Sequence, residues 1–278
     1  ALPIYTINGI VSSTSDFSTL NSAVMKAGLA STLEGTGPFT VFAPNNESFT
    51  ASGITPAVLG ALTADQVKNI LLYHTIGASI MAAQVPAGPN APVAAANGDT
   101  LYVTNNSNGV FVNGIKVTEA DVKASNGVIH VIGNVLMPPA GNIVQMAQAD
   151  TNLSYLVAAV LRANLQGALS GSGPFTVFAP TNAAFRAAGF PTIASIQAAD
   201  VNTLTSILTY HVIGARVFSS DLTDGEQATT LNGEKVTIGL MSGATVKGMS
   251  NVSPSNIIAT NIVATNGVIH LIDQVLLP

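Results

Sequence analysis

The sequence predicts an α+β fold that is made twice, in which each domain is a β-wedge or small sandwich covered by several helices. First, blocks of sequence from the first half return in the same order in the second half. Second, apolar residues at helical spacing come early in each half and strand-like runs with Asn-Gly turns come late, which favours separate helices and hairpins over repeated βαβ units. Third, 278 residues are enough for two domains that each bury a core.

Three blocks define the repeat. The longest has eight residues that recur unchanged, which is not expected by chance. Small differences in spacing between the blocks indicate loops that vary on a retained scaffold. Since the second copy ends at Leu277-Pro278 and the first has the matching Met137-Pro138, we expect domains at 1–138 and 139–278. The blocks are GPFTVFAP at 37–44 and 173–180, the Tyr-His pairs at 73–74 and 210–211, and NGVIH at 126–130 and 266–270.

An amphipathic helix is predicted early in each copy. Apolar residues follow helical spacing over 17–27 and again over 153–163. Asp16 and Asn152 stand directly before these segments, and we expect them to cap the two helices.

The other predicted elements follow in chain order. The β-branched and aromatic runs at 39–42 and 175–178 predict a buried strand that Pro44 or Pro180 closes, with a short helix after it. Thr63 and Gln66 form a capping-box signature before a helix that ends on the first Tyr-His pair. The last third of each copy predicts strands with Asn-Gly turns, at 100–104, 110–112 and 128–135 in the first copy and at 268–275 in the second.

The composition excludes several function classes. Charged residues make up 8% of the chain and apolar residues 47%, so uncharged polar residues must supply most of the hydrophilic surface. The net charge of −5 comes from thinly spread groups with no basic run, which argues against nucleic acid as a partner. No uninterrupted apolar run of about 18 residues occurs, so we expect no membrane-spanning segment. The chain has no cysteine and begins without an initiator methionine, as the mature form of an exported protein or a trimmed chain does.

Catalytic and metal-binding motifs are missing from the sequence. It contains no Gly-x-Ser-x-Gly elbow, no P-loop and no Gly-x-Gly-x-x-Gly fingerprint, so we expect no enzyme and no cofactor. All four histidines lie in the repeated blocks. They either maintain the fold or form a pair in each copy that binds a metal ion or a partner. The HExxH and HxH spacings typical of metal sites are missing, which argues against a metal ion. The acidic cluster DLTDGE (221–226) is either a solvated turn or a weak calcium site. The apolar segment 80–96 is either a packed loop or a contact surface.

The recurring blocks resemble the fasciclin-type (FAS1) domain. The resemblance rests on TVFAPNNESF (40–49) and TVFAPTNAAF (176–185), the Tyr-His pairs, and NGVIHVIGNVLMP and NGVIHLIDQVLLP, and two tandem copies cover the whole chain. It implies a compact β-wedge with helices, which is usually secreted or held at a surface and is used in adhesion and matrix assembly.

The same resemblance supplies candidate partner-binding residues. In animal members, an Asp-Ile element before the last block and the region of the Tyr-His pair are connected with integrin binding. The first copy keeps the acid, whereas the second copy has no carboxylate there to complete a receptor-held cation. The candidates are Tyr73, His74, Asp121 and Val122 in the first copy and Tyr210, His211, Asn261 and Ile262 in the second.

These observations predict an extracytoplasmic module for cell adhesion or for interaction with a matrix or biofilm. Its partner is expected to be an extracellular protein or a polysaccharide, and its location secreted, periplasmic or at the cell surface. The alternative is a carrier of a small apolar ligand such as a lipid or carotenoid, since some algal members of the family bind carotenoids and segment 80–96 could line such a site.

Overall fold

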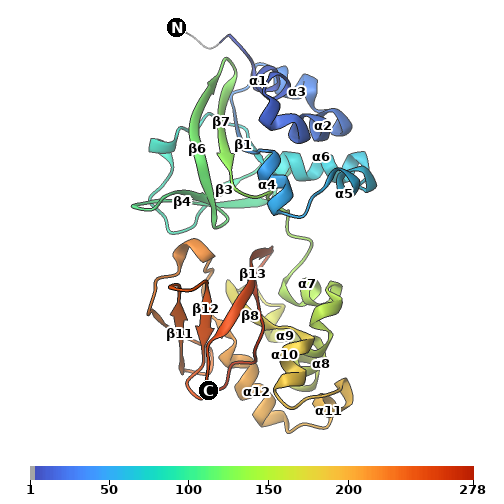
Figure 1. The fold of residues 1–278 in the computed structure, drawn as a ribbon, viewed down its shortest axis with the longest axis vertical. Helices are drawn as coiled ribbons and strands as arrows, with labels where there is room; N and C mark the ends of the chain where they lie inside the picture. Colours follow the sequence, from blue (N-terminus) through green and yellow to red (C-terminus); the bar gives the residue numbers. More distant parts are fainter. Residues whose placement is uncertain (1–3) are drawn as a thin grey trace. The chain divides into compact units, whose positions relative to one another are not determined.

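The structure is a computed structural model and describes residues 4–278. The chain divides into two compact units, Ala1–Pro138 and Pro139–Pro278. Each unit has its own seven-stranded sheet and its own helices, and the two are described separately (Figure 1).

The first domain begins with helices and ends with strands. Its sheet has the order β2-β1-β7-β6-β5-β4-β3. Its helices are α1 (Ile7–Ser13), η1 (Ser15–Phe17), α2 (Ser18–Ala27), α3 (Ala30–Glu34), α4 (Asn46–Ala51), α5 (Pro56–Ala61), α6 (Ala64–Tyr73) and η2 (Ala82–Gln84). Its strands are β1 (Phe39–Pro44), β2 (Thr75–Ile76), β3 (Ala91–Ala94), β4 (Thr100–Asn106), β5 (Gly109–Val112), β6 (Ile115–Ala124) and β7 (Gly127–Ile132).

The second domain repeats this plan. Its sheet has the order β10-β11-β12-β13-β14-β8-β9. Its helices are α7 (Ile143–Ala149), η3 (Thr151–Leu153), α8 (Ser154–Arg162), α9 (Gln166–Leu169), α10 (Asn182–Ala187), α11 (Ile193–Gln197), α12 (Val201–Tyr210) and η4 (Ser219–Asp221). Its strands are β8 (Phe175–Pro180), β9 (Val212–Ile213), β10 (Gln227–Thr229), β11 (Lys235–Gly239), β12 (Thr245–Lys247), β13 (Ser255–Ala264) and β14 (Gly267–Ile272).

The α+β prediction is confirmed, with one addition. Most neighbouring strands pair antiparallel, but β1 runs parallel to β7 from Phe39 opposite Gly127 to Pro44 opposite Ile132. The second domain has the same parallel pair, β8 with β14. The hairpin signals in the sequence could not show this pairing, because its two strands lie far apart in the sequence of each copy.

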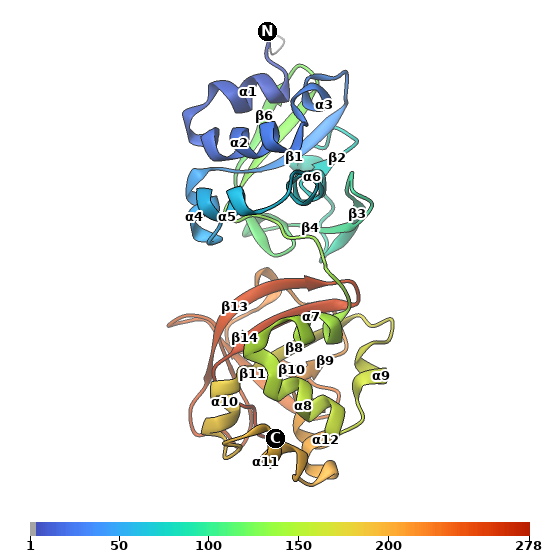
Figure 2. The same ribbon diagram turned by 90° about the vertical axis from the view of Figure 1, so that its right-hand side faces the viewer.

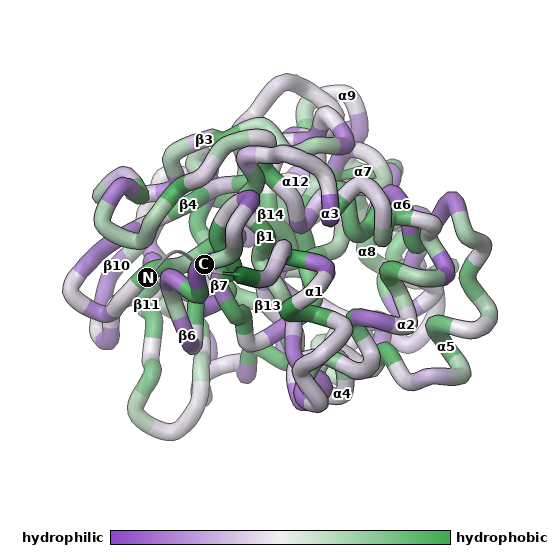
Figure 3. The backbone as a smooth tube through the Cα atoms, turned by 90° about the horizontal axis from the view of Figure 1, so that it is seen from above, coloured by the Kyte–Doolittle hydropathy of each residue, from purple (hydrophilic) through white to green (hydrophobic). Residues whose placement is uncertain are grey.

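The central pair β1 and β7 separates two apolar cores in the first domain. Val41 and Ile129 face the helices, whereas Phe42 and Ile132 face the hairpin strands β3 to β5. The α-helices therefore lie on one side of the sheet, as Figure 2 shows for each domain. Figure 3 shows hydrophilic residues in short segments along the backbone rather than in long runs, in keeping with the low share of charged residues.

Two expectations about the first helices were wrong. Asp16 lies inside η1 and Asn152 lies inside η3, so neither residue caps the helix that follows. The residues directly before α2 and α8 make no side-chain cap either. Instead, Asn46 of α4 accepts a hydrogen bond from the Thr19 N–H at 3.0 Å. In the second copy Asn182 does the same for Tyr155 at 2.9 Å, so each helix is capped by a residue that is distant in sequence.

The helices α1 and α3 were not predicted, and the asparagine of the NGVIH block explains them. The Asn126 Oδ1 accepts from the Ile7 N–H at the start of α1, and its Nδ2 donates to the carbonyls of Leu33 and Gly35 at the end of α3. Asn266 makes the equivalent three bonds in the second domain. One buried amide therefore attaches two short helices to the sheet.

Candidate functional site

Each Tyr-His pair stands at the C-terminal end of a ten-residue helix, α6 in the first domain and α12 in the second, as predicted. The hydroxyl of Tyr73, at the end of α6, donates to the Thr100 carbonyl at 3.0 Å and accepts from Asn113 Nδ2 at 2.9 Å. The Tyr210 hydroxyl donates to Lys235 and accepts from the Met249 N–H, and burial raises its pKa. Each tyrosine thus connects the helical side of its domain to the hairpin strands.

The following histidine is a buried, neutral connector. His74 Nδ1 donates to the Ile70 carbonyl at 2.7 Å, and its Nε2 accepts from the Leu136 N–H at 2.9 Å. Because Nε2 accepts, the ring carries its proton on Nδ1. Burial lowers the pKa of His74 to about 4, partly opposed by the bond to Ile70. His211 has the same two bonds and the same pKa of about 4.

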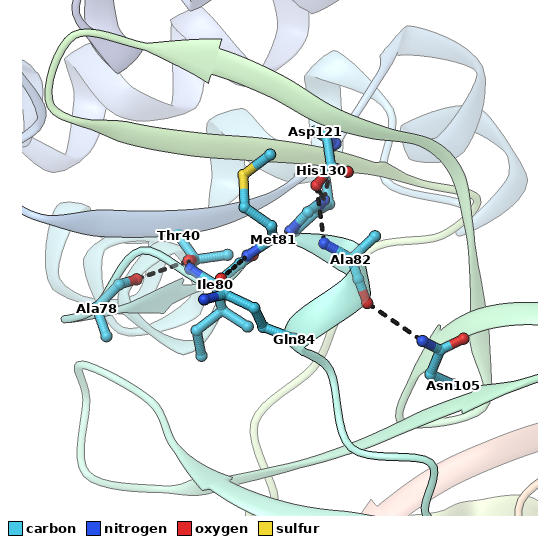
Figure 4. Close-up of polar contacts among 9 residues, drawn as sticks. All are labelled: Thr40, Ala78, Ile80, Met81, Ala82, Gln84, Asn105, Asp121 and His130. Atoms are coloured by element: carbon cyan, nitrogen blue, oxygen red, sulfur yellow. Dashed lines mark hydrogen bonds and ion pairs between the residues drawn. The ribbon is translucent and has the colours of Figure 1, made fainter.

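The second histidine of each domain fixes a bulge in the neighbouring strand. Figure 4 shows His130 of β7 between Asp121 of β6 and the segment that leads into η2. Its Nε2 donates to the Ile80 carbonyl at 2.7 Å, and its Nδ1 accepts from the Asp121 N–H at 3.1 Å. The register between β6 and β7 shifts at this point. The Asp121 carboxylate lies 3.9 Å from Nδ1, but that nitrogen is an acceptor here, so the pair is not a salt bridge.

Asp121 has a conformation that few residue types accept. Its φ is +61°, in the left-handed region where Asn and Asp are the favoured non-glycine residues. Its Oδ1 accepts from the Ala82 N–H at 2.8 Å and so holds the first turn of η2. The backbone therefore gives a structural reason for an Asp or Asn at this position.

Asn261 confirms that reason in the second domain. Its φ is also +61°, its N–H donates to His270 Nδ1, and its Oδ1 accepts from the Ser219 N–H at 2.8 Å. Its amide nitrogen adds a bond to the Ser219 hydroxyl at 2.7 Å, which a carboxylate could not donate. Burial lowers the pKa of His270. The change from acid to amide between the copies therefore preserves the local structure.

The eight candidate residues differ in how far they reach the surface. Asp121 has a side chain that is 36% exposed, and Asn261 is partly exposed. Val122 and Ile262 are partly buried against the helical cores. The two Tyr-His pairs are buried. Any influence of those pairs on a partner would thus pass through the fold, and the partner-binding role of all eight residues stays a prediction.

Segment 80–96 lines an apolar cleft in the first domain. The cleft has a volume of about 250 Å³, and its walls come from Ile80, Gln84, Val85, Pro86 and Val93, together with core residues that include His130. The segment is therefore packed against the domain and also bounds a cavity. Sequence reasoning singled out the segment but missed Thr40, whose hydroxyl donates to Ala78 and accepts from the Ile80 N–H.

The acidic cluster 221–226 is a capped turn. Asp221 accepts from the Phe218 N–H, Asp224 from the Leu240 N–H, and Glu226 from the Thr223 N–H. Across residues 4–278, no three His, Cys, Asp or Glu side chains group in a way that could hold a metal ion. Within the same range, none of the helices has the length and apolar character needed to span a membrane.

Known proteins resemble this chain over nearly its whole length. The family model described as the fasciclin domain matches residues 15–138 and 151–278. The transforming growth factor-beta-induced protein ig-h3 of Sus scrofa is 29% identical over 251 residues, which are 88% of this chain and 35% of that protein. Periostin of Homo sapiens is 31% identical over 251 residues, 88% of this chain and 29% of that protein. The chain thus spans about a third of the length of these curated relatives.

One solved structure, a FAS1 domain pair from the insect cell adhesion molecule fasciclin I, is 20% identical to this chain. The superposition covers 95% of this chain and 97% of the solved chain, with a TM-score of 0.47. Both copies match the family model and have the same arrangement of strands, histidines and bulge. The chain belongs to the fasciclin-domain family and carries two of its domains in tandem.

Proposed function

We propose that this chain is an extracytoplasmic, non-catalytic module for cell adhesion or for interaction with a matrix or biofilm, with its two domains at 1–138 and 139–278. The observation that supports it best concerns the four histidines. All of their ring nitrogens bond to backbone groups of the chain itself. No imidazole is left to transfer a proton or to bind a metal ion, which argues against the commonest catalytic roles of histidine. Membership of the family and the thinly charged surface support a binding role.

Adhesion assays test this proposal. Purified protein is coated on plates and offered to bacterial and animal cells, and it is also applied to immobilised matrix proteins and polysaccharides. We expect saturable binding to at least one surface of this panel. A protein that binds none of these cells, matrix proteins or polysaccharides would contradict the proposal.

Asp121 is a candidate contact whose side chain is 36% exposed. If its carboxylate touches the partner, Asp121→Asn should weaken adhesion while leaving the fold intact, because Asn261 shows that the amide fits the bulge. Asn261→Asp makes the reverse exchange, amide to carboxylate, at the same position of the second domain and serves as the matched control. Unchanged adhesion of Asp121→Asn would exclude the carboxylate as a contact.

A second candidate function is the carriage of a small apolar ligand in the cleft beside segment 80–96. The specific observation is the mainly apolar wall of that cleft, whose volume of about 250 Å³ approaches the range of small-molecule sites. Protein purified from its natural host would be examined by visible absorption and by mass spectrometry of an organic extract. A clean spectrum and an empty extract would exclude this function.

A further inference from the structure

We propose that Asn108, at the tip of the hairpin between β4 and β5, is a site of spontaneous conversion to aspartate and isoaspartate in the folded protein. This modification goes beyond the proposed function, because it needs only the chain itself and water. The sequence contains seven Asn-Gly pairs, the dipeptide in which the reaction is fastest. They lie at 8–9, 97–98, 108–109, 113–114, 126–127, 232–233 and 266–267.

The reaction joins the side chain of an asparagine to the backbone of the next residue. The Gly109 nitrogen attacks Cγ of Asn108, the bond from Cγ to Nδ2 breaks, and ammonia leaves with the proton that the Gly109 nitrogen gives up. Water then opens the five-membered imide at either carbonyl and gives aspartate or isoaspartate. Glycine favours this attack because it has no β-carbon to screen the nitrogen. The carboxamide must therefore be free to turn towards the next residue.

Burial protects four of the seven pairs. The asparagine of each of these pairs is buried, which leaves the side chain little room to turn. Its Nδ2 also donates to another part of the chain, which fixes the carboxamide in place. These bonds run from Asn8 to Glu34, from Asn113 to Tyr73, from Asn126 to Leu33 and Gly35, and from Asn266 to Leu169 and Gly171.

Hydrogen bonds within a turn protect two more pairs, whose asparagines are partly exposed. Asn97 Nδ2 donates to the Asp99 carboxylate at 2.7 Å, and its Oδ1 accepts from the Asp99 N–H at 3.0 Å. Asn232 Oδ1 accepts from the Thr230 hydroxyl at 2.7 Å and from the Glu234 N–H at 2.9 Å. In both pairs the glycine N–H donates to a backbone carbonyl of the same turn, so the attacking nitrogen is held as well.

Asn108 has neither kind of protection. It is exposed, and its carboxamide makes no hydrogen bond to any residue of the range 4–278. Only its backbone is held, because its N–H donates to Asn106 Oδ1 at 2.9 Å. Asn106 and Gly109 form the last pair between β4 and β5, and Asn108 lies in the short loop beyond it. Opening of such an exposed hairpin end costs little free energy, so the side chain can reach the Gly109 nitrogen.

The product differs from asparagine in charge and in covalent structure. A carboxylate replaces the neutral amide, which adds one negative charge to a chain whose net charge is −5. Isoaspartate also adds a methylene to the backbone of the short loop that joins β4 to β5. Time alone therefore produces an acidic form of the protein that is altered at this hairpin tip.

Peptide mapping by mass spectrometry tests this inference on the full chain. The protein is incubated at neutral and at mildly alkaline pH, both folded and in guanidinium chloride, and each Asn-Gly peptide is examined for the mass gain of the acid. Chromatography separates isoaspartate from aspartate. Asn108→Ser removes the site, and Asp99→Ala frees the Asn97 side chain from one of its bonds. Circular dichroism establishes that both variants are folded.

We expect all seven pairs to react at similar rates in guanidinium chloride. In the folded chain Asn108 should react at least about tenfold faster than the other six, because their hydrogen bonds must break first. The rate should rise with pH, since the attacking nitrogen must lose its proton. Asp99→Ala should accelerate the reaction of Asn97 and leave that of Asn108 unchanged.

Three results would overturn the inference. The first is a folded chain in which Asn108 reacts no faster than Asn97 or Asn232. The second is an acidic form that appears at the same rate in the Asn108→Ser variant, as isoelectric focusing would show. The third is an unchanged rate at Asn97 in the folded Asp99→Ala variant, because the protection by hydrogen bonds would then be absent.

Discussion

Acidification from pH 7 to pH 5 is expected to destabilise each domain through the histidine that follows its helix-ending tyrosine. His74 and His211 each have a pKa of about 4 in the folded domain, against 6.5 for an exposed histidine. Protonation of either ring would place a charge in the core and convert the Nε2 that accepts from Leu136 or Leu276 into a donor. The unfolded chain binds this proton more readily than the folded one, so stability rises with pH between these two pKa values.

The size of the effect follows from the two pKa values. At pH 7 both states are mostly neutral and the contribution is close to zero. At pH 5 the unfolded ring is nearly all protonated and the folded ring is not, which costs the folded state about 2 kcal/mol per domain. This is a large part of the stability of a domain of this size. In the second domain His270 adds to this loss, because burial lowers its pKa as well.

Hydrogen exchange measured by mass spectrometry at pH 7, 6 and 5 gives the stability of each domain separately, because each peptide comes from one domain. The exchange rates are first corrected for the intrinsic effect of pH. His74→Gln is the test variant, because glutamine keeps an acceptor near the Leu136 N–H and does not titrate in this range. The variant should be less stable at pH 7, and its first domain should lose most of the dependence on pH. A first domain equally stable at pH 7 and pH 5, or an unaltered slope in the variant, would refute the reasoning.

Three further substitutions test other parts of the structure, each by urea denaturation followed by circular dichroism. Asn126→Ala removes three hydrogen bonds, two of them buried, and should cost about 3 kcal/mol, with Asn266→Ala as the matched change. Gly127→Ala should prevent folding of the first domain, because a β-carbon there would overlap the backbone of Phe39 on the adjacent strand. Asp121→Asn should stay within about 0.5 kcal/mol of the unchanged chain, whereas Asp121→Val should cost about 2 kcal/mol, since a β-branched residue is strained at φ +61°.

Local signals were enough for much of the fold. The helix α6 carries its start in Thr63 and Gln66, which form the capping box that the structure shows. The strand β1 was recognised from its β-branched and aromatic run before Pro44. Such elements are encoded within a few neighbouring residues, and their prediction needs no knowledge of the rest of the chain.

Elements that depend on distant partners were missed. The helix α1 contains Gly9 and β-branched residues that disfavour helices, and it is stabilised from across the domain by Asn126. The bulge at Asp121 depends on His130 of the next strand. One signal was available in the sequence: the two copies place Asp and Asn at the same position, and these are the residues that tolerate a left-handed backbone.

The parallel pair β1–β7 also governs the order in which each domain can be completed during synthesis. The edge of β1 that pairs with β7 stays unpaired until β7 has left the ribosome, because β7 is the last strand of its copy. Strands β1 and β8 have the same sequence, FTVFAP, and β7 and β14 share GVIH, so either early strand is chemically suited to either late one. During synthesis from the N-terminus, β7 is available to pair with β1 before β14 has been made. In a complete chain that refolds after dilution from denaturant, β1 can pair with either β7 or β14 from the start. The duplication therefore makes exchange of strands between copies a hazard of refolding that is smaller during translation.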